Sequence, residues 1–145
     1  MTQLVVFSLG SEGYGLPITQ VQEIIRFSEP RSIPNPHASI RGVINLRGRI
    51  IPVCDLKLQL DVHAAERPDS ACEIVIVESE GGSAGLIVDG VSEVMTVTEE
   101  QIEAEAGSRE GYLNGIAKVG ERLIVLLDAP GLVGALGISA HAEAA

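Results

Sequence analysis

The sequence is poor in aromatic residues. Its 145 residues include two Phe, two Tyr and no Trp, although 46% of them are hydrophobic. The core must therefore be built from Val, Ile and Leu, and such side chains favour β-structure. Proteins that bind single-stranded nucleic acid stack successive bases on aromatic rings, and this chain has too few rings to do so.

Positive charge is also scarce, with ten Lys and Arg against twenty Asp and Glu, and the net charge is −10. This balance argues against nucleic-acid binding, which depends on basic contacts with phosphates. Residues 1–60 carry a net charge of +2 and residues 61–145 a net charge of −12. Two interpretations stay open. The protein has an ordinary solvated acidic surface, or its two halves face different partners, the first through its arginines.

Long hydrophobic runs, a leader segment and paired cysteines are missing as well. No apolar run approaches the roughly 18–20 residues of a membrane span, and Met1-Thr2-Gln3 leads directly into the first predicted strand. We therefore expect a cytoplasmic protein. Cys54 and Cys72 lack a C-x-x-C partner or a nearby His, so we predict reduced core or near-core thiols and no metal site.

Sequence motifs of common enzyme classes are not found. The chain has no G-x-S-x-G, P-loop, G-x-G-x-x-G or H-E-x-x-H pattern. The three histidines fall in a proline-rich connector, a linker and the tail, and the acidic pairs between 99 and 105 are typical of a solvated face. We expect no catalytic site and no cofactor.

The most informative segment that is present runs from Gly42 to Leu56. It predicts two apolar strands joined at Arg47-Gly48, followed by Asp55 as the cap of a short helix. Gly48 suits a turn position with positive φ. The hairpin would therefore present Arg47 at its rim.

An internal repeat extends this pattern over the whole chain. Residues 15–24 align without gaps on residues 85–94, and the hairpin with its capping Asp recurs over residues 115–128. Short apolar runs can align by chance, but two blocks in the same order argue against chance. We therefore expect Gly15 to be equivalent to Gly85, and Asp55 to Asp128.

The chain is predicted to be mainly all-β, with two five-stranded barrels packed together and a few short helices. The predicted strands are 3–9, 13–18, 40–46, 49–54, 73–79, 84–89, 92–97, 113–119 and 122–127. A capping-box pattern at Thr19–Gln22 predicts a short helix over 20–25, and Thr98 is expected to cap another. The subdomain halves are approximately 1–60 and 73–137, joined by a linker over 61–72 and followed by a flexible tail over 138–145. Which strand closes which barrel stays open.

Several of these segments together resemble CheW-type chemotaxis coupling proteins. The resemblance is carried by R-G-V-I-N-L-R-G (Arg41–Gly48) and V-D-G-V-S-E-V (Val88–Val94), and it covers about residues 3–137. It implies a single CheW-like domain over 1–145 with two SH3-like barrels. It also implies a non-enzymatic adaptor that joins methyl-accepting chemoreceptors to the regulatory domain of a CheA-type histidine kinase. Such an adaptor would work at receptor arrays on the inner face of the membrane, with swimming, twitching or another pathway as its output.

The resemblance also assigns roles to particular residues. Arg47 matches the arginine most tied to coupling, and Glu23 matches a glutamate that can pair with it. The full receptor-binding set is Val21, Glu23, Arg41, Gly42, Asn45, Leu46, Arg47 and Gly48. Val88, Asp89, Gly90 and Val91 are either partner-facing or structural. The kinase would contact apolar ends of both barrels. The alternative function is a small-molecule-sensing regulatory β-domain with an apolar groove between its barrels.

Overall fold

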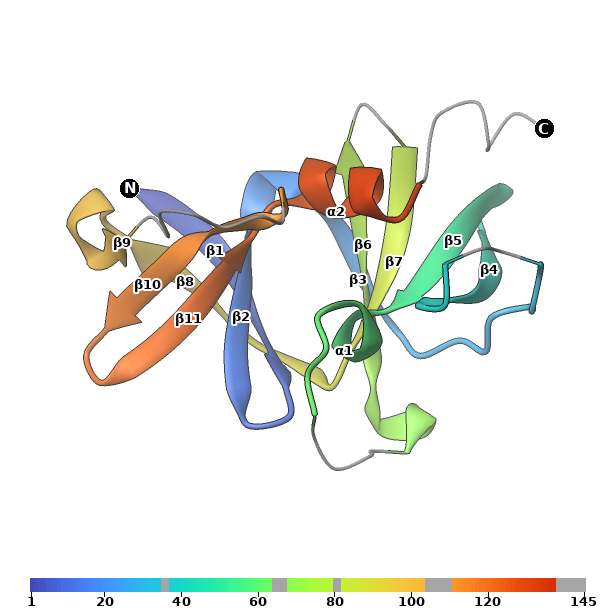
Figure 1. Cartoon of the computed structure of the whole chain (residues 1–145), viewed down its shortest axis with the longest axis horizontal. Helices are drawn as coiled ribbons and strands as arrows, with labels where there is room; N and C mark the ends of the chain where they lie inside the picture. Colours follow the sequence, from blue (N-terminus) through green and yellow to red (C-terminus); the bar gives the residue numbers. More distant parts are fainter. Residues whose placement is uncertain (35–36, 64–67, 80–81, 104–110, 138–145) are drawn as a thin grey trace.

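The protein is mainly β and has two separate sheets. A computed structural model describes residues 1–34, 37–63, 68–79, 82–103 and 111–137. The two sheets lie side by side, and short helices sit at and near their junction (Figure 1). The predicted tail over 138–145 and part of the predicted linker lie outside the described residues.

One sheet has six strands in the order β8-β1-β2-β11-β10-β9. Its strands are β1 (Thr2–Leu9), β2 (Glu12–Pro17), β8 (Gly90–Val97), β9 (Ile102–Glu103), β10 (Leu113–Val119) and β11 (Arg122–Leu127). β1 pairs antiparallel with both β2 and β8, whereas β2 pairs parallel with β11.

The other sheet has five strands in the order β3-β6-β7-β5-β4. Its strands are β3 (Val21–Arg26), β4 (Ile40–Leu46), β5 (Arg49–Asp55), β6 (Glu73–Ser79) and β7 (Gly82–Val88). β6 pairs antiparallel with both β7 and β3, and β7 pairs parallel with β5. All five strands fall within residues 21–88, so the five-stranded sheet is contiguous in sequence and the six-stranded sheet is split around it.

The two sheets have the same plan and have exchanged one strand each. β8-β1-β2-β11-β10 corresponds, strand by strand, to β3-β6-β7-β5-β4. β3 follows the first repeat's hairpin but pairs with β6 of the second repeat, and β8 makes the reciprocal pairing with β1. The two-barrel expectation is confirmed, with the two-residue strand β9 added at one edge. The halves 1–60 and 73–137 describe the repeat in the sequence, because each sheet takes strands from both.

The strand register shows the expected equivalences. Gly15 lies opposite Leu126, and Gly85 lies opposite Val53. In each hairpin the capping Asp lies two residues beyond the residue that faces the glycine. Asp55 caps α1 (Leu56–Gln59) and Asp128 caps α2 (Ala129–Ala135), each accepting a hydrogen bond from the backbone N–H three residues later.

The predicted helix over 20–25 is wrong. A single 3-10 turn, η1 (Ile18–Gln20), has no side-chain cap and leads directly into β3. Half-buried and exposed residues alternate along β3, and its backbone pairs with β6, so tertiary pairing overrides the local capping pattern. Two further 3-10 turns are η2 (Asp69–Ala71) and η3 (Glu99–Gln101), and the expected capping box of Thr98 with Gln101 is present in the latter.

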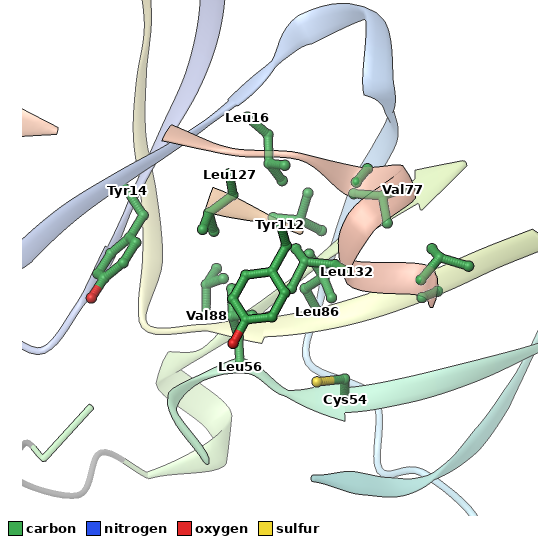
Figure 2. Close-up of a cluster of buried hydrophobic side chains, with 14 of the residues drawn as sticks. Tyr14, Leu16, Cys54, Leu56, Val77, Leu86, Val88, Tyr112, Leu127 and Leu132 are labelled. Carbon is green, nitrogen blue, oxygen red and sulfur yellow. The ribbon is translucent and has the colours of Figure 1, made fainter. Parts of the chain in front are cut away.

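One apolar core joins the two sheets. α2 and the facing strands of both sheets supply it, and several of its side chains converge in one cluster (Figure 2). Its fully buried members include Phe7, Leu9, Leu16, Cys54, Leu56, Val75, Val77, Leu86, Val88, Leu127 and Leu132. Cys54 and Cys72 are both buried thiols, as predicted. Burial raises the pKa of the Cys54 thiol to about 12.

Candidate partner-binding site

The hairpin between β4 and β5 has a two-residue turn made of Arg47 and Gly48. The closing pair is Leu46 with Arg49, and the two turn residues have φ values of 52° and 85°. Two positive φ values are the signature of a type I′ turn. Asn45 supports the turn, because its Oδ1 accepts a hydrogen bond from the Gly48 N–H at 2.9 Å. Gly48 fulfils the expected role, whereas the left-handed backbone of Arg47 was not foreseen.

Arg47 and Glu23 form a two-pronged ion pair at the surface. Arg47 Nη1 donates to Glu23 Oε1 at 2.6 Å, and Nη2 donates to Oε2 at 2.8 Å. The hydrogen bonds and the charge of Glu23 raise the pKa of the Arg47 guanidinium. β3 and β4 are the two edges of the five-stranded sheet, so the pair connects one edge to the turn at the other. Arg47 remains 72% exposed, so its outer side is accessible to a partner.

Two apolar side chains within three residues of this pair in sequence are also exposed. Ile24 follows Glu23 on β3 and is 38% exposed, and Ile50 on β5 is 52% exposed. Val21 and Leu46, two further members of the predicted set, are half-buried and pack against core clusters. The structure thus brings Glu23, Asn45, Leu46, Arg47 and Gly48 together where the β4–β5 turn at one edge of the five-stranded sheet meets β3 at the other.

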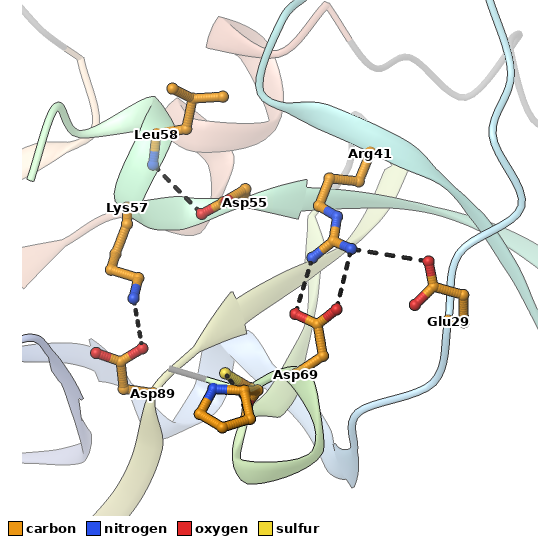
Figure 3. A network of polar contacts seen from close by, with 9 residues as sticks. Glu29, Arg41, Asp55, Lys57, Leu58, Asp69 and Asp89 are labelled. Carbon is orange, nitrogen blue, oxygen red and sulfur yellow. Dashed lines mark hydrogen bonds and ion pairs between the residues drawn. The ribbon is translucent and has the colours of Figure 1, made fainter. Parts of the chain in front are cut away.

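Arg41 lies at the opposite end of β4 from Arg47, roughly 20 Å away at the rise of a β-strand. Its guanidinium is held by Asp69 at 3.4 Å and Glu29 at 3.8 Å (Figure 3). It also lies over the ring of Phe27. The hydrogen bond to Asp69 is the main cause of its raised pKa. The structure therefore separates Arg41 from Arg47 and ties it to the segments around residues 29 and 69.

Gly42 permits a close approach of two backbone segments. Its φ is 151°, and a Cβ there would overlap the carbonyl oxygen of Arg31. Arg31 and Val43 exchange two backbone hydrogen bonds of 2.8 and 2.9 Å at this point. Gly115, its counterpart in the repeat, has a φ of 131° and also sits at a register shift. A glycine is therefore required at position 42 because the two backbone segments pack too closely for a side chain.

The Val88–Val91 segment carries the chain from one sheet to the other. Val88 and Asp89 are buried, with 0% and 1% exposure, and Gly90 and Val91 are half-buried. Burial of this degree favours the structural role over the partner-facing one.

A second surface ion pair was not predicted from the sequence. Arg122 Nη1 donates to Glu93 Oε1 at 2.6 Å in the six-stranded sheet. Val94 and Leu123, the next residues in sequence, are each 55% exposed and match Ile24 and Ile50 in the repeat. The alignment of Glu93 with Glu23 in the repeat could have indicated that Glu93 also pairs with an arginine. The equivalent of Arg122 in the other sheet, Arg49, instead donates to Ser83 Oγ at 2.8 Å.

Arg122 and Leu123 also line an open cavity of about 460 Å³. Its other walls are β1, the turn after β1 with the start of β2, Ser92 and Glu121. In the five-stranded sheet Arg49 reaches Ser83, whose counterpart in the six-stranded sheet is Gly13, which has no side chain to meet an arginine. The two sheet ends therefore differ in shape although their strands correspond.

Within the described ranges no helix reaches the length and hydrophobicity that a membrane span requires.

Comparisons with known proteins agree with this architecture. The family model of the CheW-like domain matches residues 3–136. The chain is 37% identical over 131 residues to the chemotaxis protein CheW of Klebsiella aerogenes, covering 87% of this chain and 78% of that protein. It is 34% identical to the CheW of Bacillus subtilis over 131 residues, covering 88% and 83% of the two chains.

A solved structure is similar as well. The crystal structure of the scaffolding protein TtCheW from Thermoanaerobacter tengcongensis superposes with a TM-score of 0.79 at 39% sequence identity. The match covers 87% of this chain and 88% of that one. These relatives lend no support to the alternative of a small-molecule sensor. The chain therefore belongs to the CheW-like family and is a chemotaxis adaptor with two SH3-like barrels.

Proposed function

We propose that this adaptor binds the cytoplasmic hairpin of a methyl-accepting chemoreceptor and the regulatory domain of a CheA-type kinase at the same time. It works at receptor arrays on the inner face of the membrane and catalyses no reaction. The observation that carries the receptor assignment is the exposed, two-pronged pair of Arg47 with Glu23.

The receptor side is assigned to the edge of the five-stranded sheet that carries Arg47. Glu23 is only 21% exposed and holds the guanidinium in one orientation before a partner arrives. A receptor carboxylate or helix-terminal carbonyl can then accept from the outer N–H groups of Arg47, because a guanidinium presents five donors in a fixed plane. Ile24 and Ile50 supply exposed apolar area for a helical partner.

The kinase side is assigned to the end of the six-stranded sheet that carries Glu93 and Arg122. Val94 and Leu123 form the exposed apolar part of this end. A kinase regulatory domain of the same fold family can pair with it barrel to barrel. Two partners on two different sheets would then provide avidity in an assembled array.

A three-component titration tests this proposal. The full chain is titrated by calorimetry with a receptor hairpin fragment, with a kinase regulatory domain, and with each in the presence of the other. We expect micromolar affinity for each partner, or about 8 kcal/mol, and a complex of all three. Arg47→Ala should weaken receptor binding alone, and Arg122→Ala should weaken kinase binding alone. Competition between the two partners for one site would disprove the two-surface arrangement.

A further inference from the structure

The chain crosses between the two sheets at a buried charged residue, Asp89. It stands between the end of β7 in the five-stranded sheet and the start of β8 in the six-stranded sheet. Its side chain is 1% exposed, and its backbone N–H donates to the carbonyl oxygen of Ser8 at 3.0 Å. A carboxylate this deeply buried is costly unless it is paired.

The two oxygens of this carboxylate are held by different sheets. Oδ2 accepts a hydrogen bond of 2.6 Å from the Gly10 N–H, in the turn between β1 and β2. Oδ1 lies 2.9 Å from Lys57 Nζ, on the short helix α1 that follows β5 (Figure 3). Within the part of the chain that the structure describes, Oδ1 has no aligned hydrogen-bond donor. The positive charge of the Lys57 ammonium therefore balances the negative charge of this buried oxygen.

The first crossover, between β2 and β3, is held in a comparable place by the neutral side chain of Gln20. Gln20 Nε2 donates to Asp128 Oδ1 at 3.1 Å, and Gln20 Oε1 accepts from the Ala129 N–H at 2.8 Å. Each crossover is therefore tied to the short helix that ends one of the two hairpins. The contact at Asp89 differs, because it is ionic and buried.

These contacts are directional, whereas the shared apolar core is not. Hydrophobic burial depends on the area removed from water and tolerates small rotations of one sheet on the other. The Asp89 carboxylate must keep Gly10 and Lys57 within hydrogen-bond distance at once, or an unpaired charge stays buried.

We propose that Asp89 is a positioning residue whose carboxylate, shared by Gly10 and Lys57, fixes the orientation of the six-stranded sheet relative to the five-stranded sheet. The angle between the two partner surfaces follows from this orientation. Only this last consequence rests on the proposed function.

Residual dipolar couplings of the backbone amides in the full chain test the proposal. The wild-type couplings of both sheets should fit one alignment tensor. The double variant Lys57→Met/Asp89→Asn removes both charges at similar side-chain size, and we expect each sheet to fit its own, different tensor. Lys118→Met is the matched control, because Lys118 pairs with Glu103 at the same 2.9 Å but on the surface of one sheet. A common tensor in the double variant would overturn the proposal.

A second set of variants keeps the test decisive if the double variant fails to fold. Lys57→Arg preserves the charge and should keep the common tensor, whereas Lys57→Gln should lose it. Lys57→Met alone should lower the Tm by roughly 10 °C, because it leaves the carboxylate uncompensated. An unchanged Tm in Lys57→Met would contradict the pairing.

Binding measurements separate this proposal from the proposed function. In the double variant each partner alone should bind within about twofold of wild type, and assembly of the three-component complex should weaken about tenfold. If the wild-type chain binds neither partner, the proposed function fails while the dipolar couplings still decide the role of Asp89.

Discussion

At the scale of single residues, the sharpest prediction concerns the contribution of Arg47 to receptor binding. Arg47→Ala removes all donors and should weaken receptor binding about 30-fold, or about 2 kcal/mol, if the contact is desolvated in the complex. Arg47→Lys should recover little of this loss, because an ammonium cannot reproduce the planar pair of donors seen with Glu23. Calorimetry with a receptor fragment measures both, and wild-type affinity in Arg47→Ala would refute the assignment.

The backbone of Arg47 supplies a control that separates binding from folding. Its φ of 52° costs a residue with a Cβ about 1 kcal/mol, and glycine avoids this cost. Arg47→Gly should therefore lose as much affinity as Arg47→Ala while its melting temperature stays at or above that of Arg47→Ala. A double-mutant cycle with Glu23→Ala then measures how far the two side chains act as one unit.

Cys54 predicts a loss of stability in alkali. Its pKa is raised from 9.0 to about 12 in the folded chain, so the unfolded thiol ionises first as the pH rises. The neutral buried thiol stabilises the fold fully below pH 9, and this stabilisation is lost as the pH rises from 9 to 12. The loss amounts to about 1.4 kcal/mol at pH 10. Urea unfolding at pH 8 and pH 10 under reducing conditions should show a loss that is larger by this amount in wild type than in Cys54→Ala. Tyr14, whose pKa burial also raises, is present in both proteins and cancels.

At the scale of elements, the two helix caps are equivalent in position but unequal in consequence. Asp55→Ala removes one hydrogen bond to the Leu58 N–H and should lower the free energy of unfolding by about 1 kcal/mol. Asp128→Ala removes the bond to the Gly131 N–H and also the contact with Gln20, so it should cost about 2 kcal/mol. Denaturant unfolding measures both, with the Asn variants as controls that keep an acceptor. Equal losses would show that the Gln20 contact contributes nothing.

Gly42 and Gly90 form a second matched pair at this scale. Gly42→Ala places a Cβ against the Arg31 carbonyl in a strained backbone and should cost about 3 kcal/mol. Gly90→Ala meets nothing within 4 Å and should change the free energy of unfolding by less than about 0.5 kcal/mol. Similar melting temperatures for the two variants would contradict this explanation of Gly42.

Most strands were predictable because their signals are local. Alternating or continuous Val, Ile and Leu bounded by Gly located β4 and β5, and the repeat located their counterparts β10 and β11. β3 was mistaken for a helix because Thr19 and Gln22 match a capping box, although the aligned segment of the second repeat was predicted as a strand. The pairing of Arg47 with Glu23 was expected from the resemblance. The Arg122–Glu93 pair and the burial of Asp89 depend on contacts between distant segments, which local patterns do not specify.

At the scale of the whole molecule, the exchange of β3 and β8 was not predictable from the repeat. Either repeat could have closed its own sheet with the strand that follows its hairpin, and the apolar pattern of that strand is the same in both arrangements. In the exchanged arrangement the crossovers at η1 and Asp89 are both held by polar contacts between distant segments. Internal symmetry thus predicts the number of sheets but not the route of the chain between them.

The nesting of one sheet within the other also sets an order of events during synthesis on the ribosome. Residues 21–88 contain every strand of the five-stranded sheet, so this sheet can close as soon as β7 has emerged. β1 and β2 are made first yet must wait for β8 and β11, which arrive some 80 to 110 residues later. At 5–20 residues per second this delay lasts roughly 4–20 s, and an open β1–β2 hairpin is exposed throughout. The β1–β2 hairpin is therefore translated before the other strands and is among the last to be completed by its partners.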